Sequence, residues 1–361
     1  MRFRPKLMRN RKSFVVLAIG LALVAALFGY FRWRSSDALV AREQMLALAP
    51  ADASAVFFID LAQFRSSPFL LELLEWAPRP RLENDYAQFV ESTGFNYERD
   101  LDRLAMSISH EGSRSRVVAI ADGRFDRKKI EAYGAKFGAL KSSSGKTIYA
   151  VPMAGASRTA FFSFLQDDRI AWSTDAAYFA QPRAALVSAD WREHFLRLAG
   201  TPVLAVLHED LDVLGDFTQH APGGLRSPQL ASLLSQLQWI SIAGKPQGNL
   251  LRVVLDGECV SEATIRRLKE MLGGIVVLAQ MGLNDPKTTR QLDPAIRQAY
   301  LEVLESADIQ QLDRGSSKSV RVILDLTPKL FAAARRAPAE SDPPPPAPAA
   351  SEHPASRKHK K

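Results

Sequence analysis

The segment Ser13–Phe31 constrains this chain most, because none of its 19 residues is charged. A helix of that length spans about 28 Å at about 1.5 Å per residue, close to the roughly 30 Å hydrocarbon core of a bilayer. Six basic residues precede the segment, and the positive-inside rule places such an N-terminus in the cytoplasm. Tyr30, Phe31 and Trp33 lie where an aromatic belt is expected. We therefore expect residues 13–31 to cross the lipid bilayer once.

A cleaved signal peptide is the alternative interpretation. Its apolar core would have only about 7–15 residues and end at a small-x-small site. Here the run is longer and ends in Phe-Gly-Tyr-Phe-Arg-Trp-Arg, and the acceptable spacing at Ser36-Asp37-Ala38 lies beyond two arginines. The sequence favours an uncleaved signal anchor in the inner membrane, with the body from about residue 37 in the periplasm.

A second apolar run, Met271–Leu283, is uncharged but has only 13 residues. That length predicts a buried core helix rather than a second span.

Charge and cysteine usage exclude two further classes of protein. The net charge of the chain is +8, and residues 1–36 alone hold eight basic and no acidic residues. The last segment, 337–361, adds +1, so residues 37–336 carry −1. The near-neutral body gives no electrostatic argument for a nucleic-acid partner. Cys259 is the single cysteine, which excludes an internal disulfide.

The pattern of the body predicts an α+β fold. The N-terminal transmembrane helix would be followed by two similar antiparallel sheet-plus-helix units, as an internal duplication, and by a disordered tail. The expected divisions are 1–12 as a cytoplasmic basic segment, 13–31 as the signal anchor, 32–50 as a stalk, 51–190 and 191–336 as the two α+β units, and 337–361 as the tail.

In the first unit, branched and aromatic runs predict strands, and apolar residues at 3–4 spacing predict helices. The expected strands are 54–60, 101–109, 116–123, 147–152, 159–168 and 169–175. The expected helices are 65–77, with Ser67 as cap and Pro68 at its first position, 82–94, closed by Gly94, and 126–138.

The second unit repeats this order. Thr201–Leu214 parallels Asp52–Phe64, and Leu237–Leu272 parallels Leu101–Phe137. In both halves a strand pair ends in Asp-Gly, at Asp122-Gly123 and Asp256-Gly257. The simplest interpretation is a strand-to-helix turn whose carboxylate lies near a helix start.

The tail 337–361 is rich in Pro and Ala and lacks apolar periodicity, so it cannot bury a core and is expected to be disordered. Its last residues, "RKHKK", are either a contact for an anionic polymer or lipid or a solvated end. The solvated end is the favoured interpretation.

A phosphate-loop ending, Gly145-Lys146-Thr147, raises the question of nucleotide binding. The motif requires a glycine five positions before Gly145, where Leu140 stands, and it must leave a strand and open a helix. The order here is reversed, since a predicted helix precedes and a predicted strand follows. Gly145 is better interpreted as a turn glycine, and we expect no nucleotide and no cofactor.

Two patterns could support a membrane-tethered hydrolase. Ser143 and Lys146 have S-x-x-K spacing, but the partner S-D-N and K-T-G elements are absent from the sequence. His208, Asp210 and His220 form a second cluster, yet its histidines are twelve positions apart, unlike zinc ligands on one helix face. A strand leading into an acidic loop explains this cluster better. His110, beside Glu111, is expected to be exposed. We assign no catalytic, cofactor-binding or metal-binding residue.

Three stretches, "LAPADASAVFFIDLAQFRSSPF", "VVAIADGRFDRKKIEAY" and "GKTIYAVP", resemble a group of uncharacterised bacterial proteins with a signal anchor and an extracytoplasmic domain of unknown function. The resemblance covers most of Ala49–Phe179. It implies a fold type and a location, and it brings no active site.

The sequence thus predicts a non-enzymatic, membrane-anchored periplasmic protein that binds or scaffolds an envelope protein or polymer. A tethered hydrolase and a sensor or chaperone-like factor for exported proteins are the alternatives, and the last would need an exposed apolar groove.

Overall fold

The computed structural model describes residues 40–76, 84–111, 114–141, 147–152, 159–180, 189–198, 200–208, 228–315 and 317–331. The expected span 13–31 and the tail 337–361 lie outside these residues. Within the described ranges, no helix combines the length and the apolar character needed to cross a membrane. The fold is α+β, with helices on a large antiparallel sheet.

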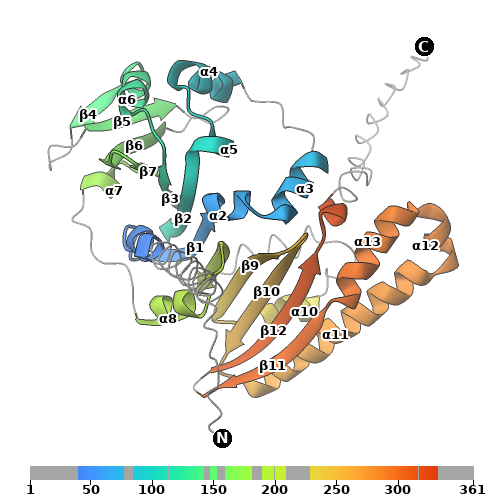
Figure 1. Ribbon diagram of the computed structural model, residues 1–361. Coiled ribbons are helices and arrows are strands. Elements are labelled where there is room, and N and C mark those ends of the chain that lie inside the picture. The colour runs from blue at the N-terminus through green and yellow to red at the C-terminus, as the bar shows by residue number, and fades with distance from the viewer. Residues whose placement is uncertain are drawn as a thin grey trace, which may run out of the picture.

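One antiparallel sheet of twelve strands forms the centre of the molecule (Figure 1), in the order β11-β12-β10-β9-β8-β1-β2-β3-β7-β6-β5-β4. The strands are β1 (Ala53–Asp60), β2 (Leu101–Glu111), β3 (Arg114–Gly123), β4 (Ala139–Lys141), β5 (Thr147–Pro152), β6 (Thr159–Gln166), β7 (Arg169–Ser173), β8 (Val203–His208), β9 (Trp239–Gln247), β10 (Leu250–Cys259), β11 (Asp308–Arg314) and β12 (Ser317–Leu326).

The strand order is the same when read outward from the β1–β8 pair at the centre. On one side β1 is followed by β2, β3, β7 and β6, and on the other β8 is followed by β9, β10, β12 and β11. Val56 lies opposite Val206 in this central pair. The two halves therefore share one continuous sheet.

Local sequence signals place several of the helices. Ser67 precedes α3, and its hydroxyl oxygen accepts a hydrogen bond from the Leu70 amide at 3.3 Å. Asp126 caps α6 in the same way through Lys129 N, at 3.2 Å. The helices are α2 (Leu61–Arg65), α3 (Pro68–Trp76), α4 (Asn84–Thr93), α5 (Tyr97–Asp100), α6 (Arg127–Ala135), α7 (Ala177–Ala180), α8 (Ala189–Arg197), α10 (Pro228–Leu234), α11 (Glu262–Asn284), α12 (Pro286–Gln291) and α13 (Pro294–Glu305), with residues 40–46 also helical.

The two faces of the sheet carry different cores. On one face, residues 40–46 and α8 pack over the central strands, where Trp191 and Phe195 meet Phe58 and Val206. On the other face, α10 and α11 cover the β8–β12 end through residues such as Leu230 and Ile265. Because each core takes side chains from both halves of the chain, the central strands are covered on both sides.

The long helix α11 corrects one expectation. A helix over 271–283 is confirmed as part of α11, which has 23 residues. Met271, Leu272 and Ile275 pack partly buried against the core, but the burial predicted for the rest of the run is wrong. Ile265 and Leu268 are fully buried, whereas Val277, Leu278 and Met281 are 53%, 68% and 64% exposed. The first half of α11 lies on the sheet, and the second half contacts α13 and leads into α12 (Figure 1). An apolar run of core length was therefore no guarantee of burial.

Candidate functional site

Both recurring aspartates lie inside strands, so their assignment to strand-to-helix turns was wrong. Asp122 in β3 lies opposite Arg169 in β7, which donates to it from Nε at 2.5 Å and from Nη2 at 2.8 Å. Asp256 in β10 lies opposite Arg321 in β12, whose Nε and Nη2 both donate at 2.8 Å. The two halves of the sheet thus have a bidentate cross-strand pair at the same place.

The glycine after each aspartate allows close packing. A Cβ atom at Gly123 would lie 2.3 Å from the Asp100 carbonyl oxygen, and one at Gly257 would lie 2.8 Å from Leu237 Cδ1. Side chains alternate between the faces of a strand. The Asp-Gly pair therefore puts a carboxylate on one face and leaves room for a neighbouring segment on the other.

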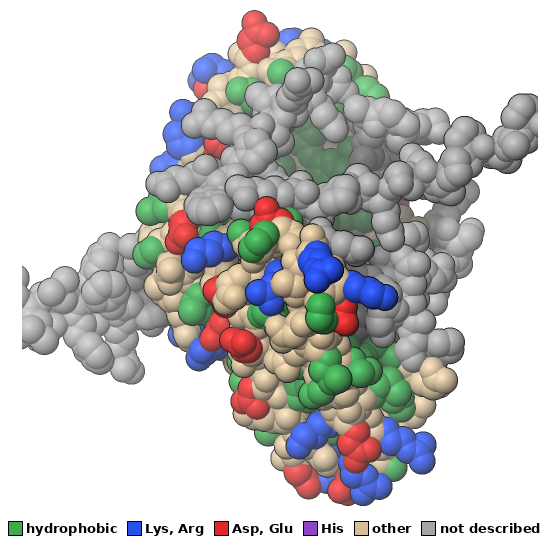
Figure 2. All heavy atoms as spheres, turned by 90° about the vertical axis from the view of Figure 1, so that its right-hand side faces the viewer, with side chains coloured by type: hydrophobic (Ala, Val, Ile, Leu, Met, Phe, Trp, Pro, Cys, Tyr) green, Lys and Arg blue, Asp and Glu red, His purple; other side chains and the backbone are tan. Residues whose placement is uncertain are grey.

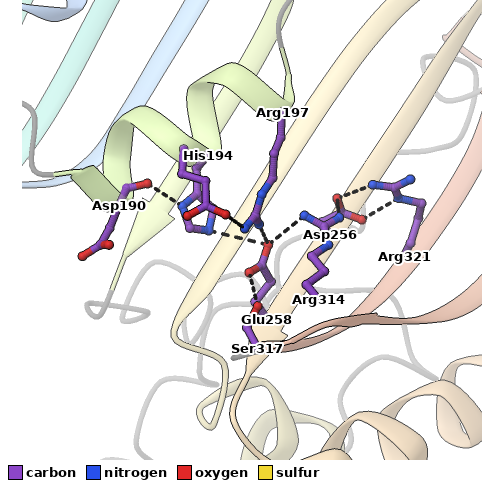
Figure 3. Close-up of polar contacts among 9 residues, drawn as sticks. Asp190, His194, Arg197, Asp256, Glu258, Arg314, Ser317 and Arg321 are labelled. Carbon is purple, nitrogen blue, oxygen red and sulfur yellow. Dashed lines mark hydrogen bonds and ion pairs between the residues drawn. The ribbon is translucent and has the colours of Figure 1, made fainter.

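Glu258 extends the second of these pairs into a buried charged cluster (Figure 3). It lies two residues after Asp256, on the same face of β10, and both residues are only 3% exposed. Arg197 of α8 donates to Glu258 Oε1, and Arg314 of β11 reaches the same oxygen at 3.4 Å and Asp256 Oδ2 at 2.8 Å. The cluster therefore joins α8, β10, β11 and β12.

His194 of α8 completes this cluster. Its Nδ1 lies 2.8 Å from the Asp190 carbonyl oxygen, which can only accept, so Nδ1 carries a hydrogen. Its Nε2 lies 3.6 Å from Glu258 Oε1 and can donate to it only when the ring is charged. The ring stacks on Trp239 with centroids 4.1 Å apart. The Asp190 carbonyl and the Trp239 ring therefore fix the position of this histidine and the hydrogen on its Nδ1.

The electrostatics keep Glu258 ionised. Burial raises the pKa of this carboxyl, but the neighbouring His194 ring and the charges of Arg197 and Arg314 outweigh it, so the net pKa is lowered. Ser317 Oγ also donates to Glu258, at 3.1 Å. Ser317 and His194 thus both face the carboxylate of Glu258 and do not bond to each other. A hydrolytic triad needs a hydrogen bond between its serine and its histidine, so these residues do not form one. This cluster braces α8 against the sheet.

Of the five residues that the sequence offered for a hydrolase, only His208 lies within the described residues. Ser143, Gly145, Lys146, Asp210 and His220 lie outside the described residues.

Two of the described histidines, His194 and His208, pack on the same ring, that of Trp239. The ring of His208, at the end of β8, lies 3.8 Å from that of Trp239. His110 is exposed, as predicted, with Nδ1 3.0 Å from Ser54 Oγ. Cys259 is 2% exposed, and burial raises the pKa of its thiol. The described ranges hold no group of three or more His, Cys, Asp or Glu residues that could bind a metal ion.

The strongest surface feature is the exposed face of α11. Gly274, Val277, Leu278 and Met281 follow at spacings of three and four, so they lie on one side of the helix. No charged residue occurs between Glu270 and Asp285. Figure 2 views the side of the molecule that carries α11, α12 and α13 and shows hydrophobic side chains at the surface between charged groups. Sequence reasoning found this apolar run but assigned it to the core.

Comparisons with known proteins add little. No protein-family model matches the chain, and no curated protein matches it in sequence. Among solved structures, crystal forms IV, I and III of TP0453 are similar at 10% identity with a TM-score of 0.41. The match covers 80% of this chain and 95% of the chain in forms IV and I, or 96% in form III.

Proposed function

We propose that this chain is a single-pass, membrane-anchored periplasmic protein whose body binds or scaffolds another envelope protein through α11. The exposed apolar face of that helix carries the proposal. Its three large side chains, Val277, Leu278 and Met281, are each more than half exposed. Soluble surfaces with contiguous apolar side chains of this kind mark interaction sites.

The energetics favour a protein partner for this face. Fully burying one Val, Leu or Met side chain contributes about 1.5–3 kcal/mol, so three neighbouring side chains can form the centre of an interface. The α11 segment between Glu270 and Asp285 carries no charge, so burying it would desolvate no unpaired charge of that segment. A partner with an apolar groove could bury this face of α11, as in the helix-in-groove mode of recognition.

A chaperone-like factor for exported proteins is the second candidate, and the same exposed face favours it. Such a factor would contact many unfolded chains, whereas a scaffold would contact one or a few partners.

We further infer that the two halves arose by duplication. The mirrored strand order supports this inference, and so do the paired Asp122–Arg169 and Asp256–Arg321 contacts at equivalent positions. If the halves are duplicates, α6 is the counterpart of α11, but α6 has 9 residues and α11 has 23. The exposed extension of α11 would then be specific to the second half.

The test has a topology arm and a contact arm. A reporter that is active only outside the cytoplasm, fused after Lys361, should be active in cells that retain the full-length protein in the membrane. A photocrosslinking amino acid at Leu278 should then give one or a few discrete adducts in living cells, and the same residue at exposed Arg266 on this helix should give none. Equal adducts at both positions, or none at Leu278, would refute α11 as the binding face. A broad smear from Leu278 alone would favour the chaperone-like factor.

A further inference from the structure

A pocket of about 570 Å³ lies between the helical residues 40–46 and α8. Small-molecule sites typically have volumes of about 300–1,000 Å³. The described residues that line it are Arg42, Glu43, Gln44, Leu46, Ala47, Arg192, Phe195 and Leu196. This pocket is separate from both the buried charged cluster and the exposed face of α11.

Arg42 gives this pocket its electrostatic character. The residue is only 3% exposed, and its Nη1 and Nη2 donate to the carbonyl oxygens of Leu198 at 3.3 Å and Phe195 at 3.4 Å. Its Nε is buried without a hydrogen-bond partner in the described structure. Burial lowers the pKa of this guanidinium, although the charge of neighbouring Glu43 acts to raise it, and no ion pair links Arg42 to a carboxylate within the described residues.

Capping the C-terminal end of α8 does not by itself compensate the buried charge of Arg42. The carbonyl end of a helix carries roughly half an elementary negative charge, so it offsets only part of the guanidinium charge. The two bonds to carbonyl oxygens are long, and they leave Nε unused. Glu43 acts on this charge without forming an ion pair with it. A buried charge without an ion-pair partner is costly, and an anion bound in the pocket would offset that cost.

The rest of the wall combines a second cation with apolar surface. Arg192 is exposed at the pocket, and Glu43 is the acidic residue among the described lining. Leu46, Phe195 and Leu196 supply the apolar part, and Leu196 is 54% exposed. The two arginines suit a carboxylate or phosphate group, and the neighbouring side chains suit a hydrocarbon chain.

We propose that this pocket binds an anionic amphiphile, an acyl chain that ends in a carboxylate or phosphate. We expect the amphiphile to come from the lipid bilayer. This choice of source rests on the proposed membrane anchor, whereas binding in the pocket does not. The expected span ends at Phe31, nine residues before Val40, and nine extended residues reach at most about 30 Å. The helix that carries Arg42 therefore begins within that distance of the membrane.

Photolabelling of the full chain tests this proposal. The protein is held in nanodiscs of phosphatidylcholine and exposed to a photoreactive ten-carbon fatty acid, and labelled peptides are identified by mass spectrometry. We expect labelling within 40–47 and 192–196, at least tenfold stronger than with the matched uncharged alcohol. Decyl phosphate should compete for the label, and inorganic phosphate at the same concentration should not.

Variants separate the pocket from general adsorption. Leu196→Glu should lower labelling about tenfold, because it places a negative charge in the apolar wall, and Arg192→Gln should lower it severalfold. Both residues are exposed, so neither change removes core packing. The matched controls, Leu71→Glu on α3 and Arg266→Gln on α11, should leave labelling unchanged, since both residues are exposed and lie outside the pocket. Equal labelling by the alcohol, equal competition by inorganic phosphate, or indifference to both pocket variants would overturn the proposal.

Discussion

Glu258 is a residue at which a single change should be costly. Its carboxylate is bonded to Arg197, Arg314 and Ser317 while only 3% exposed. Glu258→Gln keeps the shape but removes the negative charge, which leaves the arginines without this partner. Breaking a buried ion pair on one side costs about 3–5 kcal/mol. We expect a loss of that order in the free energy of unfolding, measured by urea titration of the full chain in detergent.

The control for this change is Asp167→Asn. Asp167 also bonds an arginine, Arg127 at 2.9 Å, but its side chain is 90% exposed. Exposed ion pairs contribute only about 0–1 kcal/mol. If Glu258→Gln costs no more than this control, the cluster does not brace α8 in the way argued here.

Asp100 should make stability depend on pH. Hydrogen bonds from Arg99 are the main cause that lowers the pKa of this carboxyl from 3.8 to about 2. Because the folded value lies below the unfolded one, the contribution is complete above pH 4 and is lost as pH falls from about 4 to about 2. Asp100→Asn should therefore be less stable than the wild type at pH 6, and the difference should shrink toward pH 2.

The difference between the two proteins is the quantity to measure, because other carboxyls titrate in the same range. The pKa of Asp313 is lowered by its bond to Lys318, and that of Asp325 by its bond to Arg252. A difference between wild type and Asp100→Asn that stays constant from pH 6 to pH 2 would contradict the assignment.

At this scale the sequence showed where the aspartates recur but not what they bind. Asp122-Gly123 and Asp256-Gly257 stood out as equivalents, yet their partners Arg169 and Arg321 lie far along the chain. Strand register decides such a pair, and one sequence contains no direct measure of register. The cluster around Glu258 was missed for the same reason.

At the scale of the elements, Gly134 in α6 and Gly273 in α11 allow the same substitution to be compared in a packed and in an open helix position. A Cβ atom at Gly134 in α6 would lie 2.6 Å from Phe162 Cζ and 2.9 Å from Tyr149 Cβ, whereas one at Gly273 in α11 would meet nothing within 4 Å. Alanine favours a helix over glycine by about 1 kcal/mol, and overpacking costs about 1–3 kcal/mol. Gly273→Ala should raise the free energy of unfolding by about 0.5–1 kcal/mol, and Gly134→Ala should lower it.

Urea titration of both variants checks this contrast. An equal gain from the two substitutions would mean that α6 does not pack on β5 and β6 as closely as described.

Local sequence signals predicted the ends of the helices better than they predicted which side chains are buried. Ser67, Gly94 and Asp126 mark helix ends that the structure confirms within a few residues. The helices α12 and α13 went unpredicted, although each begins with Pro after a capping Asp, at Asp285 and Asp293. The exposure of α11 could not be read from its composition, because it depends on where the helix leaves the sheet.

For the whole molecule, the sequence predicted two similar units but not how they meet. Their order of elements could be compared segment by segment along the chain. Their union depends on the pairing of β1 with β8, which joins Val56 to Val206. Long-range pairing of this kind is decided by the packing of both faces, and local pattern does not contain it. From the continuous sheet we expect the two halves to fold as one unit.

This union predicts the behaviour of a divided chain. Fragments 1–184 and 185–361, made together, should associate and co-purify, because the cut leaves every described helix and strand whole. Each fragment alone would expose the edge of β1 or β8, and with it half of a shared core, so each should aggregate. The measurement is recovery of the second fragment with an affinity tag on the first.

A matched pair of variants sharpens this last test. Val206 is fully buried at the centre of the pairing, so Val206→Asp should abolish recovery. Lys245 is exposed on β9, so Lys245→Asp should leave recovery intact. Two fragments that stay soluble, folded and separate would show instead that each half is a domain of its own, and the central β1–β8 pair would then be a contact between domains rather than the middle of one core.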